Sequence, residues 1–292
     1  MTALLQHVVD AMGLAGLYAL LALPVALIYG IMGLVNFAHG ELIMIGAYGL
    51  FIFAAVSLPL AVFLMIAVVI VAALAMERSA FRPVRGSTPE TLLVTSFAVS
   101  FLLQNLALMI FGSRPKSIET PGFLNHAVSV GGVQIEGVTI LSVTAAVVFI
   151  GGLVIFMRRT SFGMAMRAAA EDFTMARLVG IRANAVISGT FAISGAMAGV
   201  AAFILVVQGG SAFATMGLAP VIIAFVATMM GGLGSFSGAL LGAALLGAGT
   251  VAFNVVLPTE LRSSREAFVY GGVLLLLLIR PQGLIPSRKE RV

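Results

Sequence analysis

One carboxylate interrupts an otherwise apolar part of this sequence. Glu41 is the only charged residue that falls within a segment apolar enough to cross a bilayer. An ionised carboxylate is costly in hydrocarbon, so such a residue faces a bundle interior or an aqueous cavity. Polar neighbours are available at Asn36 and His39, and Gly40 permits a break in the backbone. The pattern predicts a helix break or a pathway-lining element made of Asn36, His39, Gly40 and Glu41.

Two other interpretations of Glu41 stay open at this stage. If a helix begins near Ala38, Glu41 lies in its first turn, where the positive end of the helix dipole favours a carboxylate. Glu41 would then anchor a helix terminus. Alternatively, Glu41 and His39 would relay a proton, and the chain would be a proton-coupled secondary transporter.

A pair of adjacent amides, Gln104 and Asn105, lies near the middle of a second apolar segment. Buried amides commonly pair across membrane helices, which is the structural alternative. Because of their central position, we expect these two residues to face the lumen of a pathway.

The composition shows which kind of scaffold must position these residues. The chain has 292 residues, of which 61% are hydrophobic and 9% charged, and its mean hydropathy is +1.15. Soluble domains carry about 25% charged residues, so a soluble protein is excluded. The continuous apolar runs lie at about 13–35, 38–57, 60–76, 91–111, 138–157, 185–207, 217–231, 236–257 and 267–279.

These runs are typical of membrane-spanning helices. They do not alternate in polarity as the strands of a membrane β-barrel do. We therefore predict an all-α polytopic membrane protein with about eight or nine transmembrane helices, some of them broken or re-entrant. The runs at 217–231 and 267–279 are short for a full crossing. Residues 1–292 are expected to form a single transmembrane domain, with a cytoplasmic segment at 158–184.

Arginine positions predict the orientation of the chain. Segments 77–90 and 158–184 and the C-terminal segment from Arg280 are rich in arginine, which favours the cytoplasmic side. Nine crossings with the N-terminus outside fit this alternation. Eight crossings with the N-terminus inside fit as well, if one early segment is broken or re-entrant. The net charge of +5 therefore reflects cytoplasmic loops, and no nucleic-acid partner is expected.

Two weaker patterns concern loops and repeats. Residues 128–136 alternate in polarity around Gly131-Gly132, which predicts a short extracytoplasmic β-hairpin. The glycines of 33–47 loosely echo those of 232–243. Pairs of glycine-interrupted segments occur where transporters build sites from broken helices, so the echo suggests a duplication worth testing.

Small-residue spacing predicts close helix contacts. Gly195 and Gly199 are four residues apart, as are Gly238 and Gly242. Lipid supplies no hydrophobic drive for helix association, so packing of small residues must do so. We expect these four glycines to pack helices within the chain or against a partner permease.

The segment 158–184 is the main cytoplasmic stretch. From Ser161 onward it predicts one short helix, with Arg167 and Glu171 in i,i+4 spacing and Gly180 as its stop. One face is mostly small and apolar and consists of Ala168, Ala169, Asp172, Ala176 and Val179. Such a face suits docking into a groove on another protein. The alternative is an amphipathic helix on lipid headgroups, which would need bulkier apolar anchors.

Motifs for catalysis or nucleotide binding are missing from the sequence. A P-loop needs a lysine after its glycines, but Lys116 and Lys289 follow proline and arginine. The sequence has no cysteine and no HExxH pair. We therefore expect no enzyme, no bound cofactor and no metal site in this chain, and any ATPase must be a separate protein.

Four motifs together resemble a known family. The stretch GLVNFAHGELIMIGAY (33–48) resembles the N-terminal signature of LivH-type permeases of branched-chain amino acid ABC importers, and FGMAMRAAAEDFTMARLVGI (162–181) is similar to their cytoplasmic coupling segment. GGLGSFSGALLGA (231–243) and RPQGL (280–284) look like their later motifs. The resemblance covers nearly the whole chain.

This resemblance implies a permease subunit of the bacterial inner membrane. Its partners would be a second, LivM-like permease, two cytoplasmic ATPases that hold ATP and Mg, and a periplasmic substrate-binding protein. The 162–181 segment would be the helix that couples the permease to an ATPase. The substrates would be branched-chain or other hydrophobic amino acids. Relatives for urea, short amides or small carboxylic acids keep those substrates open as an alternative.

Overall fold

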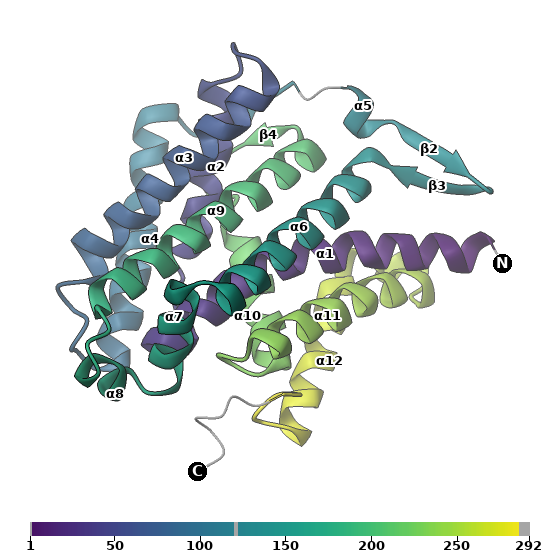
Figure 1. Ribbon diagram of the computed structural model, residues 1–292. Coiled ribbons are helices and arrows are strands. Elements are labelled where there is room, and N and C mark those ends of the chain that lie inside the picture. The colour runs from purple at the N-terminus through teal and green to yellow at the C-terminus, as the bar shows by residue number, and fades with distance from the viewer. Residues whose placement is uncertain (1, 120–121, 286–292) are drawn as a thin grey trace.

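The computed structural model describes residues 2–119 and 122–285, and helices dominate these residues (Figure 1). A helix lies at each of the nine predicted apolar runs. They are α1 (Thr2–Met32), α2 (His39–Ile52), α3 (Leu58–Met76), α4 (Pro89–Phe111), α6 (Gly137–Arg159), α9 (Ala183–Gly209), α10 (Leu218–Gly231), α11 (Phe236–Val256) and α12 (Arg265–Ile279). A π-helical turn, η1 (Glu77–Phe81), extends α3, and a 3-10 helix, η2 (Thr259–Ser264), precedes α12.

Within the described residues, six helices are long and apolar enough to cross a membrane. They are α1, α3 with η1, α4, α6, α9 and α11. By contrast, α2 and α10 have 14 residues each. A helix of that length rises about 21 Å, which is less than the ~30 Å of a hydrocarbon core. The protein is therefore an α-helical, multi-pass membrane protein that contains both full-length and shorter apolar helices.

The predicted hairpin is confirmed. Strand β2 (Ala127–Val130) pairs antiparallel with β3 (Val133–Glu136), after the short helix α5 (Gly122–Asn125). Gly131 and Gly132 connect the strands with φ values of 61° and 84°, which glycine adopts without strain. The hairpin is held to the first helix, because Gln134 N donates to Gln6 Oε1 and Gln6 Nε2 donates to Gln134 O, both at 2.8 Å.

A second strand pair ties two helix ends together. Strand β1 (Lys116–Ser117) follows α4, and β4 (Ser211–Ala212) follows α9. They pair antiparallel, and Ile118 N donates to Gly210 O at 2.9 Å. The ends of α4 and α9 therefore lie at the same end of the molecule.

The chain contains a structural repeat. The series α1–α2–α3–α4 recurs as α9–α10–α11–α12, and each series has a long helix, a break and a short helix. The same spacing separates Gly33 from Gly40 and Gly210 from Gly217. Gly33 and Gly210 both end a long helix, with φ values of 65° and 64°. Helix contacts repeat too, because α1 packs on α11 and α10 as α9 packs on α3 and α2.

The glycine similarity between 33–47 and 232–243 does not match the register of this structural repeat. The glycines of 232–243 lie after the short helix α10, whereas those of 33–40 lie before the short helix α2. The counterpart of 33–40 is 210–217. The two stretches share little beyond their glycines. A positive φ requires glycine at Gly33 and Gly210, and a close backbone contact requires it at Gly40 and Gly217.

The two halves are inverted relative to each other. The start of α1 lies beside the β2–β3 hairpin, whereas α9 starts beside α7 (Ser161–Glu171) and α8 (Phe173–Leu178) at the opposite end (Figure 1). Helices α1 and α9 therefore run antiparallel. Inverted repeats of this kind are common in membrane transporters.

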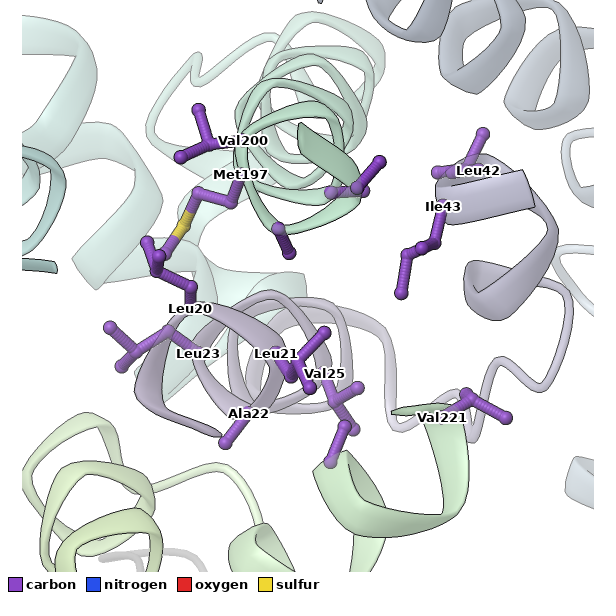
Figure 2. Close-up of a cluster of buried hydrophobic side chains, with 14 of the residues drawn as sticks. Leu20, Leu21, Ala22, Leu23, Val25, Leu42, Ile43, Met197, Val200 and Val221 are labelled. Atoms are coloured by element: carbon purple, nitrogen blue, oxygen red, sulfur yellow. The ribbon is translucent and has the colours of Figure 1, made fainter. Parts of the chain in front are cut away.

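The core lies where the two halves meet. In Figure 2, α1 passes between the helices that carry Ile43 (α2), Met197 (α9) and Val221 (α10), and its Leu20 side chain lies beside Met197. All of these side chains are 2% exposed or less. The peripheral helices differ, because only 17% of the apolar window of α4 or α6 is buried. The outer helices thus present apolar surface to lipid or to another chain.

Candidate functional site

The break before α2 places Glu41 inside the protein. The chain leaves α1 at Met32, crosses residues 33–38 without regular structure, and enters α2 at His39. Glu41 is in the first turn of α2 and is 1% exposed. The positive end of the α2 dipole therefore faces this carboxylate.

The Glu41 carboxylate is bound by two side chains of α4. Ser100 Oγ and Gln104 Nε2 both donate to Glu41 Oε1 at 2.7 Å, and Gln104 Nε2 also lies 3.3 Å from Ser100 Oγ. We call these three residues the Glu41 cluster. Sequence reasoning found Gln104 and missed Ser100, which was detectable as the residue one helical turn before Gln104.

Several polar atoms near the cluster have no hydrogen-bond partner among the residues that the structure describes. They are Glu41 Oε2, both side-chain polar atoms of Asn36, and both ring nitrogens of His39. Asn36 and His39 are 2% and 0% exposed. Buried polar groups normally have partners, so these atoms could serve a polar ligand or water. No hydrogen bond of the described residues joins His39 to Glu41, so the geometry gives the proposed proton relay no direct path.

The inner face of α4 is lined by small hydroxyl side chains. Ser96 is buried, and its Oγ accepts from Phe37 N at 3.3 Å and donates to Leu93 O at 2.8 Å. The Phe37 ring stacks on Phe97 with centroids 4.3 Å apart. Polar contacts and one ring stack therefore attach α4 to the break before α2.

Asn105 lies elsewhere. Its side chain is exposed, and Nδ2 donates to the carbonyl oxygen of Phe101 at 2.7 Å. The structure thus brings Gln104 to Glu41 and leaves Asn105 on the outer face of α4. The two amides are neighbours in sequence, but successive helix positions are rotated by about 100°, so they face different surroundings.

Gly40 itself forms the junction between the two short helices. A Cβ at Gly40 would collide with the carbonyl oxygen of Gly217, and a Cβ at Gly217 would collide with the carbonyl oxygen of Gly40. Helices α2 and α10 therefore meet backbone to backbone at their N-terminal ends, next to Glu41.

The four packing glycines act within the chain. A Cβ at Gly195 would lie 2.9 Å from Ala73 Cβ, and one at Gly199 would lie 3.2 Å from Ile66, so both pack α9 on α3. Gly238 and Gly242 pack α11 against the backbone of α10. Each pair thus closes one inter-helix contact, and both pairs lie in the second half of the repeat, on α9 and on α11.

The cytoplasmic segment is not the single helix that we predicted. The chain breaks at Asp172, between α7 and α8. Asp172 Oδ1 accepts from Thr174 N and Met175 N, both at 2.9 Å, and so caps α8. Thr160 Oγ1 caps α7 by accepting from Gly163 N at 2.9 Å. A strong N-cap residue therefore competes with helix continuation here, and α8 ends at Leu178, before Gly180.

The small-residue face predicted for docking is turned largely inward. Ala169 and Ala176 are 1% and 5% exposed, and Ala168 is half-buried. Small side chains allow α7 and α8 to approach the bundle closely, which explains this placement. The outward surface carries other residues, which are Met164, Arg167, Glu171, Asp172, Met175, Leu178, Val179 and Gly180.

A second buried carboxylate, Glu77, escaped the sequence analysis. It is 3% exposed and forms an ion pair with Arg85 Nη2. Ser188 Oγ donates to Glu77 Oε2 at 2.9 Å, and Arg85 Nη1 donates to Asn184 Oδ1 at 2.6 Å. Burial lowers the pKa of Arg85, and the charge of Glu77 opposes that shift. Glu77 directly follows an apolar run, so by sequence it looked like a loop residue.

Neither region resembles a metal site. Within residues 2–119 and 122–285, no group of three or more His, Cys, Asp or Glu side chains could hold a metal ion. A cavity of about 610 Å³ lies behind α7, lined by residues that include Gly30, Met166, Arg167 and Ser237. It separates α7 from parts of α1 and α11.

The helix breaks, the inverted halves and the buried polar cluster are features of a transport protein. Residues 7–278 match a family described as "Branched-chain amino acid transport system / permease component". The chain belongs to this family. This permease is a transport subunit and not an enzyme, and the resemblance drawn from its four motifs is confirmed.

Individual relatives match over nearly their full length. The branched-chain amino acid permease BraD of Pseudomonas aeruginosa is 36% identical over 295 residues, with 96% of this permease and 95% of BraD covered. LivH of Escherichia coli K12 is 34% identical over 297 residues, with the same coverage. A probable LivH of Methanocaldococcus jannaschii is 28% identical and covers 92% of this permease.

Proposed function

We propose that this permease is the membrane-spanning subunit of a binding-protein-dependent ABC importer for branched-chain or other hydrophobic amino acids. The printed names of BraD and LivH describe high-affinity branched-chain amino acid transport systems, which supports this substrate class. The sequence has no P-loop of its own, so ATP and Mg belong to partner chains. Those partners are two cytoplasmic ATPases, a second LivM-like permease and a periplasmic binding protein, and the location is the bacterial inner membrane.

The observation that carries this proposal is the junction of α2 and α10. Two short helices from inverted halves meet at Gly40 and Gly217, beside the buried Glu41 cluster. Transporters commonly place polar sites near the bilayer midplane, where broken helices end. Asn36, His39, Gly40, Glu41 and Gln104 thus line or flank the pathway in our proposal. Asn105 lies on the same helix as Gln104 but faces outward.

The topology that fits this arrangement has nine passes. Six passes are made by α1, α3, α4, α6, α9 and α11, and three by the short helices α2, α10 and α12 together with the segments that flank them. The N-terminus is outside, and the arginine-rich segments 77–90 and 158–184 are cytoplasmic. The charged residues beyond 285 lie outside the described residues. The whole chain forms a single permease domain.

The cytoplasmic helices α7 and α8 dock on an ATPase in this proposal. Their outward surface combines charged side chains at Arg167, Glu171 and Asp172 with exposed apolar side chains. Leu178 and Val179 are 75% and 77% exposed, which is unusual for residues next to the aqueous phase. The helices would follow the ATPases as these open and close, and alternating access would result.

Reconstitution tests the proposal. The permease, the LivM-like partner, the ATPases and the binding protein are placed in liposomes, with labelled leucine and the binding protein opposite the ATPases. We expect uptake that requires ATP and stops when the P-loop lysine of the ATPases is replaced. ATP-independent leucine uptake by the permease alone would overturn the proposal.

A further inference from the structure

The buried ion pair of Glu77 and Arg85 joins three parts of the chain. Glu77 begins η1 at the end of α3, and Arg85 lies in the loop that leads to α4. Both reach the first turns of α9, through Ser188 and Asn184 respectively. The end of α3, the start of α4 and the start of α9 are therefore tied together at one point.

The Glu77–Arg85 ion pair and its hydrogen bonds to α9 hold these elements firmly. The planar guanidinium of Arg85 uses Nη2 for Glu77 and Nη1 for Asn184, so one side chain bridges two elements. Removing one partner of a buried ion pair leaves an uncompensated charge, which is strongly unfavourable. Arg82 N also donates to Glu77 O at 2.7 Å, which closes the π-helical turn. Such turns frequently occur at functional sites.

The Glu77–Arg85 ion pair lies between the α7–α8 segment and the Glu41 cluster. On one side, α8 packs on α9, and Ile181 N donates to Ala176 O at 3.0 Å, which leaves only a short connection to Asn184. On the other side, α4 starts four residues after Arg85 and carries Ser100 and Gln104 to Glu41. Among the described elements, α4 packs mainly on α2 and η1. A shift of the start of α9 therefore has a direct route to the start of α4 through this tie, beside the route through α2, on which both helices pack.

We propose that Glu77 and Arg85 are positioning residues that transmit movement of the α7–α8 segment through the start of α9 to α4, and so to the Glu41 cluster. This proposal rests on the proposed function as an ATP-driven importer. It assigns a coupling role to a cluster that does not touch the ATPase surface or the pathway.

The sharpest test detaches the ion pair from α9 without breaking it. In the double variant Asn184→Ala with Ser188→Ala, Glu77 and Arg85 still pair, so no buried charge is left alone. The complete reconstituted transporter is measured for leucine uptake and for ATP hydrolysis stimulated by loaded binding protein. We expect uptake per ATP hydrolysed to fall about fivefold or more, a typical size for coupling between sites. The variant Asn184→Asp is expected to restore uptake per ATP hydrolysed, because its carboxylate can still accept a hydrogen bond from Arg85.

Matched controls come from the same end of the molecule. Arg82 is exposed, and Ser79 Oγ donates only to the carbonyl oxygen of Ala75 in its own helix. Arg82→Gln and Ser79→Ala should therefore leave the ratio of leucine uptake to ATP hydrolysis unchanged. A double variant with the wild-type ratio overturns the proposal while the importer function stands. If the double variant does not assemble, each single variant is measured instead, and two wild-type ratios overturn it equally. Wild-type transporter without ATP-dependent uptake refutes the proposed function itself.

Discussion

Gly40 and Gly217 touch backbone to backbone, so that each carbonyl oxygen occupies the space of a Cβ on the other residue. The contact joins the first turn of α2 to the start of α10, two helices from opposite halves of the repeat. It also places the N-terminal ends of both helices near Glu41. Several properties of this permease depend on that single close approach.

Gly40→Ala and Gly217→Ala should each separate α2 from α10. A methyl group at either position overlaps a backbone carbonyl, which cannot move aside as a side chain could. We expect a loss of about 1–3 kcal/mol or more, as for overpacked cores, seen as a lower melting temperature of the purified permease. Gly249→Ala in α11 is the control, because a Cβ there meets nothing within 4 Å. Equal melting temperatures for all three variants would contradict the contact.

Gln104→Ala and Asn105→Ala should differ, although the residues are adjacent. Gln104 donates to the buried carboxylate of Glu41, and its loss leaves Oε1 with one donor, Ser100. We expect the Gln104 variant to lose about 1–3 kcal/mol of stability and part of its uptake. The Asn105 variant should behave as wild type, because its amide bonds only the backbone of its own helix. The measurements are thermal unfolding in detergent and leucine uptake, and the reverse order of effects would be inconsistent with the Glu41 cluster.

The charge-neutral double change Arg167→Ala with Glu171→Ala should weaken coupling to the ATPases. Both side chains are exposed on α7, at the edge of the cavity that lies between α7 and parts of α1 and α11. ATPase stimulation by loaded binding protein is expected to fall, while expression and the melting temperature of the permease stay unchanged. Lys116→Ala, at the opposite end of the molecule, is the control. Wild-type stimulation in the double variant would remove this surface from the coupling mechanism.

Asp172→Ala should loosen α8. The Asp172 carboxylate accepts two backbone N–H groups of α8, and loss of such a cap costs about 1 kcal/mol of helix stability. Faster amide hydrogen exchange is expected in residues 173–178, with no change in α9. Thr174→Ala serves as the control, since it keeps the capping carboxylate. Unchanged exchange in the Asp172 variant would mean that packing on the bundle alone holds α8.

Helix periodicity and hairpin chemistry were predictable from local sequence. The nine apolar runs each contain a helix, and Gly131-Gly132 forms the expected turn. Lengths were less predictable. The run at 38–57 is nearly as long as a full crossing, but the helix α2 within it ends at Ile52, and the loop residues 54–57 are exposed.

The repeat and the coupling segment show why local patterns mislead. Gly33 and Gly210 share a backbone conformation, but their flanking side chains differ. The structural repeat was therefore not recognisable from the sequence at these positions. The prediction of a single helix through Asp172 was wrong. The Asp172 carboxylate accepts a hydrogen bond from a backbone N–H of the next turn, so a new helix starts there and α7 ends. Both outcomes depend on which backbone groups find partners.

By itself, the sequence determined that this chain is a helical membrane protein and that Glu41 needs an unusual environment. Those properties follow from composition, periodicity and the cost of burying charge. Only the tertiary structure decided which polar groups meet. It paired Glu41 with Ser100 and Gln104 but not with His39, and it brought Arg85 and Glu77 onto α9. These partners are far apart along the chain, and the packing of whole helices sets their distances.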